Sequence, residues 1–324
     1  MTKKTNLILF MLLVSQLALI TLVYWPGKGK NQAATNLLPG MNPENIVEFS
    51  ITDEAGKTLA MKREDQGEWQ VSDGKGTAYP ADAERMQGVL ATMTSLQSQR
   101  LVTRTPSSHI RLQVDDKIFA KKLAVTGKNG ETQTLIIGSS PGPQTVHVRP
   151  TAANDVYLAK GLTVSELDTE TESWWRKDYV LVDREKLKEI KLENSHGSLT
   201  LQKEGDKWRL AGDDAQQELA GAPVDTFLQR ATHLVVTRYL GKEHQGKPLD
   251  AAVLTLTTDQ ETITVTIGPE EKKDKNDGKE ADGEHVIKSS ASAFFATASA
   301  YQIKPLTGMK KADLVQKDEG SEKE

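Results

Sequence analysis

The chain has 324 residues, of which 37% are hydrophobic and 27% charged, and its formal net charge is −4. This balance is typical of a folded chain with a core and excludes a wholly disordered one. The mild acidity disfavours nucleic acid as a partner, because nucleic-acid binders usually carry a basic face. The sequence has no cysteine, which excludes disulfides, thiolate catalysis and Cys-ligated metal centres.

An apolar segment without a charged residue runs from Leu7 to Trp25. As a helix it would be about 28 Å long, close to the hydrocarbon thickness of a bilayer. Tyr24 and Trp25 stand at its far end, where an aromatic belt is expected. The segment predicts a single-pass protein of the cytoplasmic (inner) membrane that contacts lipid through this anchor. The short tail before it favours a cytoplasmic N-terminus and a periplasmic or other extracytoplasmic body.

The alternative to a retained anchor is a cleaved signal peptide, whose apolar region would be shorter. The nearest cleavage site, Asn31-Gln32-Ala33, has an unfavourable residue at its first position, so the retained anchor is preferred. Gln16 lies near the middle of the span. A mid-span glutamine is costly when it faces lipid and can bond to another helix. Gln16 is therefore a candidate partner contact.

The rest of the chain shows internal similarity between two segments. Residues 46–51 resemble 187–192, both alternating in the manner of strands. Each is followed by a turn glycine, a second strand-like run and a tryptophan, Trp69 or Trp208. Three antiparallel strands are expected in each segment.

An apolar stripe at helical spacing follows in both segments. Met86, Leu90 and Met93 define it in the first, and Phe227 and Leu228 belong to it in the second. Further strand-like runs follow each stripe. The pattern predicts an α+β fold class, in which one N-terminal transmembrane helix precedes two tandem, diverged α+β repeat domains with antiparallel sheets.

The predicted organisation is as follows: cytoplasmic tail and transmembrane anchor 1–30, linker 31–43, first α+β repeat 44–168, connector 169–186, second α+β repeat 187–315 and disordered tail 316–324. A mobile acidic insert is expected at 270–284, because that stretch has almost nothing apolar to bury.

Several of these features, taken in order, resemble the bacterial family called domain of unknown function 4340. They are the apolar N-terminal segment, Leu38-Pro39-Gly40, Tyr79-Pro80-Ala81-Asp82-Ala83, the helix, Asp155-Val156-Tyr157-Leu158 and Trp175-Arg176-Lys177-Asp178. The resemblance implies an auxiliary subunit of a gliding-motility-type ABC transporter. The implied partners are a multi-span membrane permease and its ATPase. The resemblance supplies no catalytic residues, and the acidic insert departs from the family pattern.

The sequence predicts no catalytic, cofactor-binding or metal-binding residues and no cofactor. No two of its six histidines lie three or four residues apart, and it contains no phosphate loop or nucleophile elbow. Ser107-Ser108-His109 is expected to be a polar loop, because adjacent residues rarely reach catalytic geometry. His147 and His285 fall at matching places in the two segments, so strand residues inherited by duplication are expected there.

The adjacent tryptophans Trp174 and Trp175 cannot both face one core from a strand. One of them could mark an inter-domain seam, a partner surface or a contact with lipid headgroups. Trp174, Trp175 and Arg176 are therefore the candidate partner contacts outside the anchor.

The leading hypothesis is a non-enzymatic, membrane-anchored accessory or binding protein of an ABC-type transport (export) system. The alternative is an envelope module that binds polysaccharide or peptidoglycan independently of a transporter. A hydrolase with an unfamiliar site is the third hypothesis. Genes for an ATPase and a multi-span permease beside this one would favour the first, and a polar cleft with convergent His, Asp and Ser side chains would favour the third.

Overall fold

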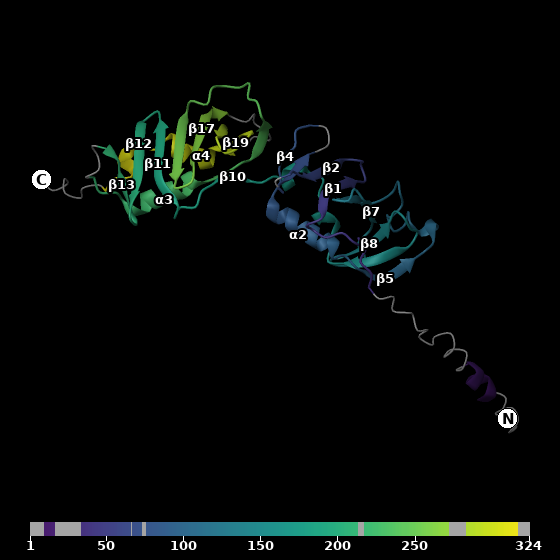
Figure 1. The fold of residues 1–324 in the computed structure, drawn as a ribbon. Helices are drawn as coiled ribbons and strands as arrows, with labels where there is room; N and C mark the ends of the chain where they lie inside the picture. The colour runs from purple at the N-terminus through teal and green to yellow at the C-terminus, as the bar shows by residue number, and fades with distance from the viewer. Residues whose placement is uncertain are drawn as a thin grey trace, which may run out of the picture. The chain divides into compact units, whose positions relative to one another are not determined.

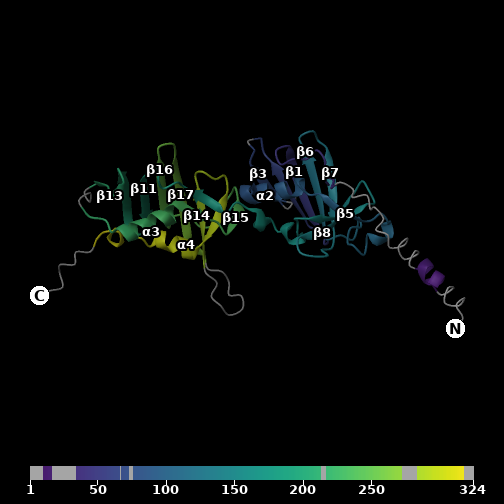
Figure 2. The same cartoon turned by 90° about the horizontal axis from the view of Figure 1, so that it is seen from below.

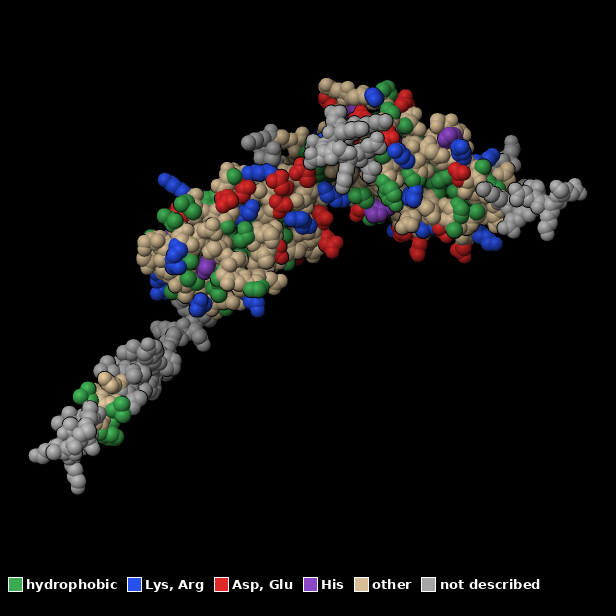
Figure 3. Space-filling model, turned by 180° about the vertical axis from the view of Figure 1, so that it is seen from behind, with side chains coloured by type: hydrophobic (Ala, Val, Ile, Leu, Met, Phe, Trp, Pro, Cys, Tyr) green, Lys and Arg blue, Asp and Glu red, His purple; other side chains and the backbone are tan. Residues whose placement is uncertain are grey.

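The computed structural model describes residues 10–16, 34–65, 67–72, 76–212, 217–271 and 283–316 (Figures 1 and 2). The chain divides into two compact units. The first contains Met1–Arg63 and Glu84–Thr169, and the second contains Glu64–Ala83 and Glu170–Glu324. On the face drawn in Figure 3, acidic and basic side chains are interspersed over the described surface of each unit.

Within the described residues, the larger sheet has nine strands in the order β4-β3-β2-β1-β6-β7-β8-β9-β5. The pairs from β2 through β1, β6, β7, β8 and β9 to β5 are antiparallel. The elements are β1 (Ile46–Asp53), β2 (Thr58–Arg63), β3 (Trp69–Ser72), β4 (Tyr79–Pro80), α2 (Ala83–Thr94), β5 (Ser98–Thr103), η1 (Pro106–Ser108), β6 (Lys121–Gly127), β7 (Thr132–Ile137), β8 (Thr145–Pro150), β9 (Val156–Lys160) and η2 (Val164–Glu166).

Alternation along the strands builds the main core of the first unit. Phe49 and Ile51 of β1 are fully buried, while the residues between and after them are partly exposed. The helix α2 contributes Met86, Leu90 and Met93, which are also buried and recur at three- and four-residue steps. One apolar helix stripe therefore packs with one apolar sheet face.

The opposite sheet face carries a second, smaller cluster under the loop that joins β5 to β6. Leu112 and Val114 of this loop pack with Ile136 of β7 and Val156 of β9. This loop therefore covers part of the sheet face that α2 leaves free.

The second sheet has eight strands in the described residues, in the order β13-β12-β11-β16-β17-β18-β19-β15, and its pairs are antiparallel. A separate two-stranded sheet pairs β10 with β14. The elements are η3 (Thr171–Trp174), β10 (Asp178–Leu181), β11 (Leu187–Asn194), β12 (Gly197–Glu204), β13 (Lys207–Leu210), α3 (Gly221–Thr232), β14 (His233–Val235), β15 (Arg238–Gly241), β16 (Ala252–Thr258), β17 (Thr262–Glu271), β18 (Glu284–Ser289), β19 (Phe295–Ser299), α4 (Ala300–Thr307) and η5 (Lys311–Asp313).

The prediction of a transmembrane helix followed by two tandem α+β repeat domains is wrong as a description of this fold. Antiparallel strands dominate the described chain, and its helices are few and short. The two units are also not successive segments, because Glu64–Ala83 belongs with the later part of the chain. Local alternation and helical stripes identify single elements, but the assignment of a hairpin to one unit or the other depends on contacts between residues far apart in sequence.

No helix among the described residues is long and apolar enough to cross a membrane. The predicted anchor falls largely outside those residues: only Phe10–Gln16 of the apolar segment is described, and it is helical.

Several predicted boundary segments contain buried residues or secondary structure. Leu37 and Leu38 of the predicted linker are buried. The predicted connector contains η3 and β10. Glu271 and Glu284, inside the predicted acidic insert, are paired between β17 and β18. Residues 272–282 and 317–324, which hold the rest of the insert and most of the tail, lie outside the described residues.

Candidate functional site

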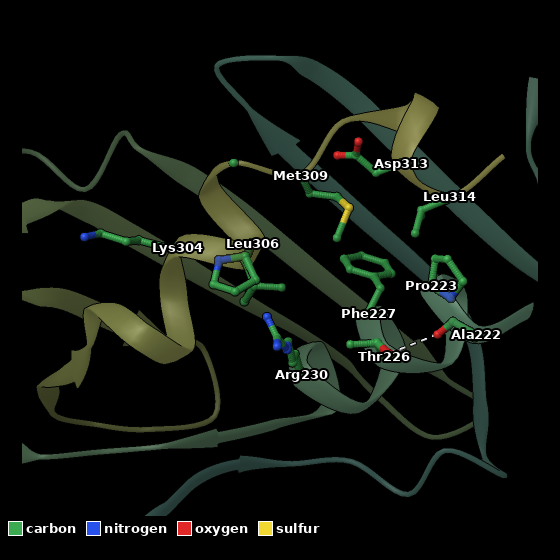
Figure 4. A pocket seen from close by; sticks show the side chains of 12 residues that line it. Ala222, Pro223, Thr226, Phe227, Arg230, Lys304, Leu306, Met309, Asp313 and Leu314 are labelled. Atoms are coloured by element: carbon green, nitrogen blue, oxygen red, sulfur yellow. Dashed lines mark hydrogen bonds between the residues drawn. The ribbon is translucent and has the colours of Figure 1, made fainter. Parts of the chain in front are cut away.

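A groove with a volume of about 550 Å³ opens on the second unit between α3 and the segment formed by α4 and η5 (Figure 4). Figure 4 shows Phe227 in the middle of the lining side chains, with Leu306, Met309 and Pro223 around it. The residues that line the groove are Ala222, Pro223, Thr226, Phe227, Arg230, Lys304, Pro305, Leu306, Gly308, Met309, Asp313 and Leu314.

The first wall of the groove is one face of α3. Ala222, Thr226 and Arg230 follow one another at four-residue steps, so their side chains lie along one side of the helix. The hydroxyl of Thr226 donates to the carbonyl of Ala222 at 3.0 Å and is therefore satisfied within the helix. Phe227, which is 1% exposed, anchors this wall in the core.

The second wall is α4 and the chain that follows it. Ser299 caps α4 by accepting a hydrogen bond from the backbone N–H of Gln302. The side-chain amide of Asn194, on β11, donates to the carbonyls of Leu306 and Met309 at 3.0 and 2.9 Å. These two bonds fix the path of the chain as it leaves α4, and so they fix the position of Met309 in the groove.

Backbone bonds tie the two walls together at one end. Ala220 N donates to Leu314 O at 2.8 Å, and Gln316 N donates to Glu218 O at 2.9 Å. Because these bonds join the start of α3 to the segment after η5, they fix the separation of the two walls at this end of the groove.

The floor of the groove is apolar and its charged side chains are few. Lys304 Nζ lies 3.0 Å from Glu270 Oε1, and Asp313 Oδ2 accepts a hydrogen bond from Lys310 N at 2.9 Å. Among the described residues, Arg230 has no ion pair. The apolar floor can contact an apolar segment, and the guanidinium of Arg230, which has no ion pair among the described residues, can bind a carboxylate on that segment.

The candidate partner contacts predicted from the sequence do not lie at this groove. Trp174 is fully buried and Trp175 is 4% exposed, both inside the second unit. Arg176 is 45% exposed and pairs with Glu68 at 3.7 Å. Gln16 is exposed at the end of the described helical stretch.

The histidines considered above have separate surroundings. His109 is buried, and its Nε2 lies 2.9 Å from Asn154 O, so it joins the loop between β5 and β6 to the turn between β8 and β9. His285 Nδ1 lies 2.8 Å from Gly268 O. His147 Nδ1 lies 3.0 Å from the hydroxyl of Ser139. No group of three or more potential metal ligands occurs within the described ranges.

The sequence predicts one wall of the groove but not the groove itself. The apolar stripe that includes Phe227 and Leu228 predicts the helix α3. The helical pattern of the other wall is harder to recognise in the sequence. Pro305 stands inside the short helix α4, and proline interrupts helical patterns.

Comparison with known proteins gives a family but no characterised relative. No curated protein and no solved structure matches the chain. The family model described as "Domain of unknown function (DUF4340)" matches residues 74–257, which is more than half of the sequence. The chain therefore belongs to the DUF4340 family.

Proposed function

We propose that this chain is a non-enzymatic accessory protein of an ABC-type transport system. Its apolar N-terminal segment holds it at the cytoplasmic membrane, and its folded units stand on the extracytoplasmic side. It binds a multi-span permease, while a separate ATPase supplies the energy.

The groove beside α3 carries this proposal. Backbone hydrogen bonds join its two walls, its floor is the apolar core residues Phe227 and Leu306, and Arg230 adds a positive charge without an ion pair among the described residues. Such a surface suits an apolar peptide segment with an acidic residue. We assign this role to an extracytoplasmic loop of the permease, with its carboxylate against Arg230.

The membrane attachment rests on the sequence alone. The uncharged stretch from Leu7 to Trp25 is long enough to reach across the hydrocarbon layer, and most of it lies outside the described residues. The resemblance to transporter-associated proteins supports the identity of the partner.

Site-specific photo-crosslinking in intact membranes tests the proposal. A photoreactive residue replaces Thr226, which lines the groove, or Gln229, which is exposed on α3 but does not line it. We expect a crosslink to a multi-span permease from position 226 and none from position 229. The charge reversal Arg230→Glu should abolish the crosslink from position 226, because it places two carboxylates together.

Equal crosslinking from both positions would show that the groove is not the docking surface. A crosslink from position 226 that survives Arg230→Glu in a folded protein would show that no carboxylate of the permease lies against Arg230. A crosslink from position 226 to a glycan polymer would replace the transporter hypothesis by the envelope-binding one.

A further inference from the structure

A row of side chains crosses three neighbouring strands of the first unit. His147 on β8 pairs with Leu158 on β9, and Leu158 pairs with Arg100 on β5. Residues that are direct partners in adjacent strands place their side chains on the same sheet face. His147 and Arg100 therefore share one face and flank Leu158.

The loop between β5 and β6 borders this row. Ser139 N donates to Leu112 O at 3.0 Å, and the hydroxyl of Ser139 donates to the same carbonyl at 3.2 Å. That hydroxyl also lies 3.0 Å from His147 Nδ1. Arg111 immediately precedes Leu112, so the loop brings a second guanidinium towards the histidine.

The hydroxyl of Ser139 lies within hydrogen-bond distance of both the Leu112 carbonyl and His147 Nδ1. A carbonyl oxygen can only accept, so when the hydroxyl hydrogen serves Leu112, His147 Nδ1 donates to Ser139 Oγ. In either tautomer the contact holds the imidazole through Nδ1 and leaves Nε2 for another group.

The surroundings of His147 are positively charged. Burial lowers the pKa of His147, a backbone hydrogen bond with Ser139 raises it, and the charges of Arg111 and Arg100 lower it again, with a net shift downwards. Within the described residues, neither arginine has an ion pair. Two other arginines of the same unit do: Arg104 pairs with Asp155 and Arg149 with Asp116. Arg100 and Arg111 therefore differ from Arg104 and Arg149, because no described carboxylate forms an ion pair with them.

We propose that Arg100, Arg111 and His147 form a binding site for a phosphate group. The planar forks of the two guanidinium groups match the oxygens of a phosphate, and His147 Nε2 adds a further contact when it is protonated. Ser139 is a positioning residue that holds the imidazole through Nδ1. The phosphate belongs to a soluble phosphate compound or to a lipid headgroup, and both present the same chemistry to these three side chains.

The test uses the full chain in detergent with inorganic phosphate as the probe. The imidazole signals of His147 are followed by NMR during the titration, with His196, an exposed turn residue of the second unit, as an internal reference. We expect a saturable shift at His147 and none at His196. Replacement of Arg100 or Arg111 by Ala should weaken binding by about tenfold or more, since each removes charge-assisted hydrogen bonds. Arg104→Ala, which removes an arginine already paired with Asp155, should leave the affinity unchanged.

Nanodiscs distinguish the two sources of phosphate. The full chain is inserted into phosphatidylcholine discs with or without phosphatidic acid. A His147 shift that appears with phosphatidic acid alone identifies a headgroup, and one that needs added inorganic phosphate identifies a soluble compound. The absence of a saturable shift in both media, or an unchanged affinity in the folded Arg100→Ala/Arg111→Ala double variant, would overturn the proposal.

Discussion

Tyr79 stacks on Tyr239, with ring centroids 5.3 Å apart and ring planes inclined by 19°. Tyr79 lies in β4 and Tyr239 in β15, and both belong to the second unit. Trp175 and Phe294 complete the cluster, with centroids 5.5 and 5.3 Å from that of Tyr79. The hairpin that carries Tyr79 is therefore fixed to the second unit by aromatic packing, although it precedes most of the first unit in sequence.

The first prediction concerns this stack. Tyr79→Ala removes the ring that touches three other aromatic residues and should lower the free energy of unfolding by about 2–4 kcal/mol. Tyr301→Ala, a matched change at a side chain that is 79% exposed, should alter it by less than about 0.5 kcal/mol. Urea denaturation followed by tryptophan fluorescence measures both. Equal effects of the two substitutions would contradict the packing role of Tyr79.

The second prediction compares Trp175 with Arg176, two of the neighbouring residues that the sequence predicts as candidate partner contacts. Trp175→Ala should cost about 3–5 kcal/mol, because it empties a buried site beside the stacked rings of Tyr79 and Tyr239, both of which Trp175 contacts edge to face. Trp175→Phe should cost much less, since the indole N–H has no hydrogen-bond partner in the described structure and phenylalanine keeps an apolar ring there.

Arg176→Ala is the comparison for both tryptophan variants. Its guanidinium is half exposed and pairs with Glu68, which is also exposed, so the change should cost at most about 1 kcal/mol. Thermal unfolding at one pH ranks the stabilities of Trp175→Ala, Trp175→Phe and Arg176→Ala. A cost for Arg176→Ala as large as that for Trp175→Ala would show that the ion pair, and not the aromatic packing, holds this segment.

Single elements could be predicted from the sequence where one face is buried. The alternation in residues 46–51 predicted a strand that the structure shows as β1, and the stripe through Leu90 predicted α2. The position of the Tyr79 hairpin could not be predicted, because the stack with Tyr239 involves residues from distant parts of the chain. The burial of Trp174 and Trp175 was missed for a related reason: Trp174 ends the short helix η3, so the two side chains do not follow strand geometry.

The groove shows the same limit. Phe227 was found as a helix residue, but its role as a groove floor depends on where α4 and Met309 are placed. That placement is set by Asn194, a polar strand residue that bonds to Leu306 O and Met309 O. A single polar side chain that anchors a distant loop leaves no periodic signal in the sequence.

The third prediction concerns two glycines with opposite surroundings. A Cβ at Gly138 would lie 2.2 Å from Leu112 O, so Gly138→Ala should push the loop away from the sheet and cost about 1–3 kcal/mol or more. Gly88 is exposed on α2, and a Cβ there meets nothing within 4 Å. Gly88→Ala should stabilise the protein by about 0.5–1 kcal/mol, because alanine favours the helix. Differential scanning calorimetry measures whether each variant unfolds at a lower or a higher temperature than the wild type. A stabilised Gly138→Ala variant would show that the loop does not approach the sheet this closely.

The last prediction concerns the pH dependence of stability at His147. Burial, the largest effect, together with the charges of Arg111 and Arg100 outweighs a backbone hydrogen bond with Ser139 that raises the pKa, and the pKa of His147 in the folded protein lies below its ordinary value of 6.5. When the pH falls below that value, the unfolded chain takes up a proton at this position before the folded chain does. The contribution of neutral His147 to stability is therefore complete above pH 6.5 and is lost as the pH falls towards the folded-state pKa. In His147→Gln this loss disappears, so the free energy of unfolding should decrease less between about pH 8 and about pH 5 than in the wild type. Urea denaturation at a series of pH values in phosphate-free buffer measures the difference. An equal or larger decrease in the variant would show that His147 is protonated as readily in the folded protein as in the unfolded chain.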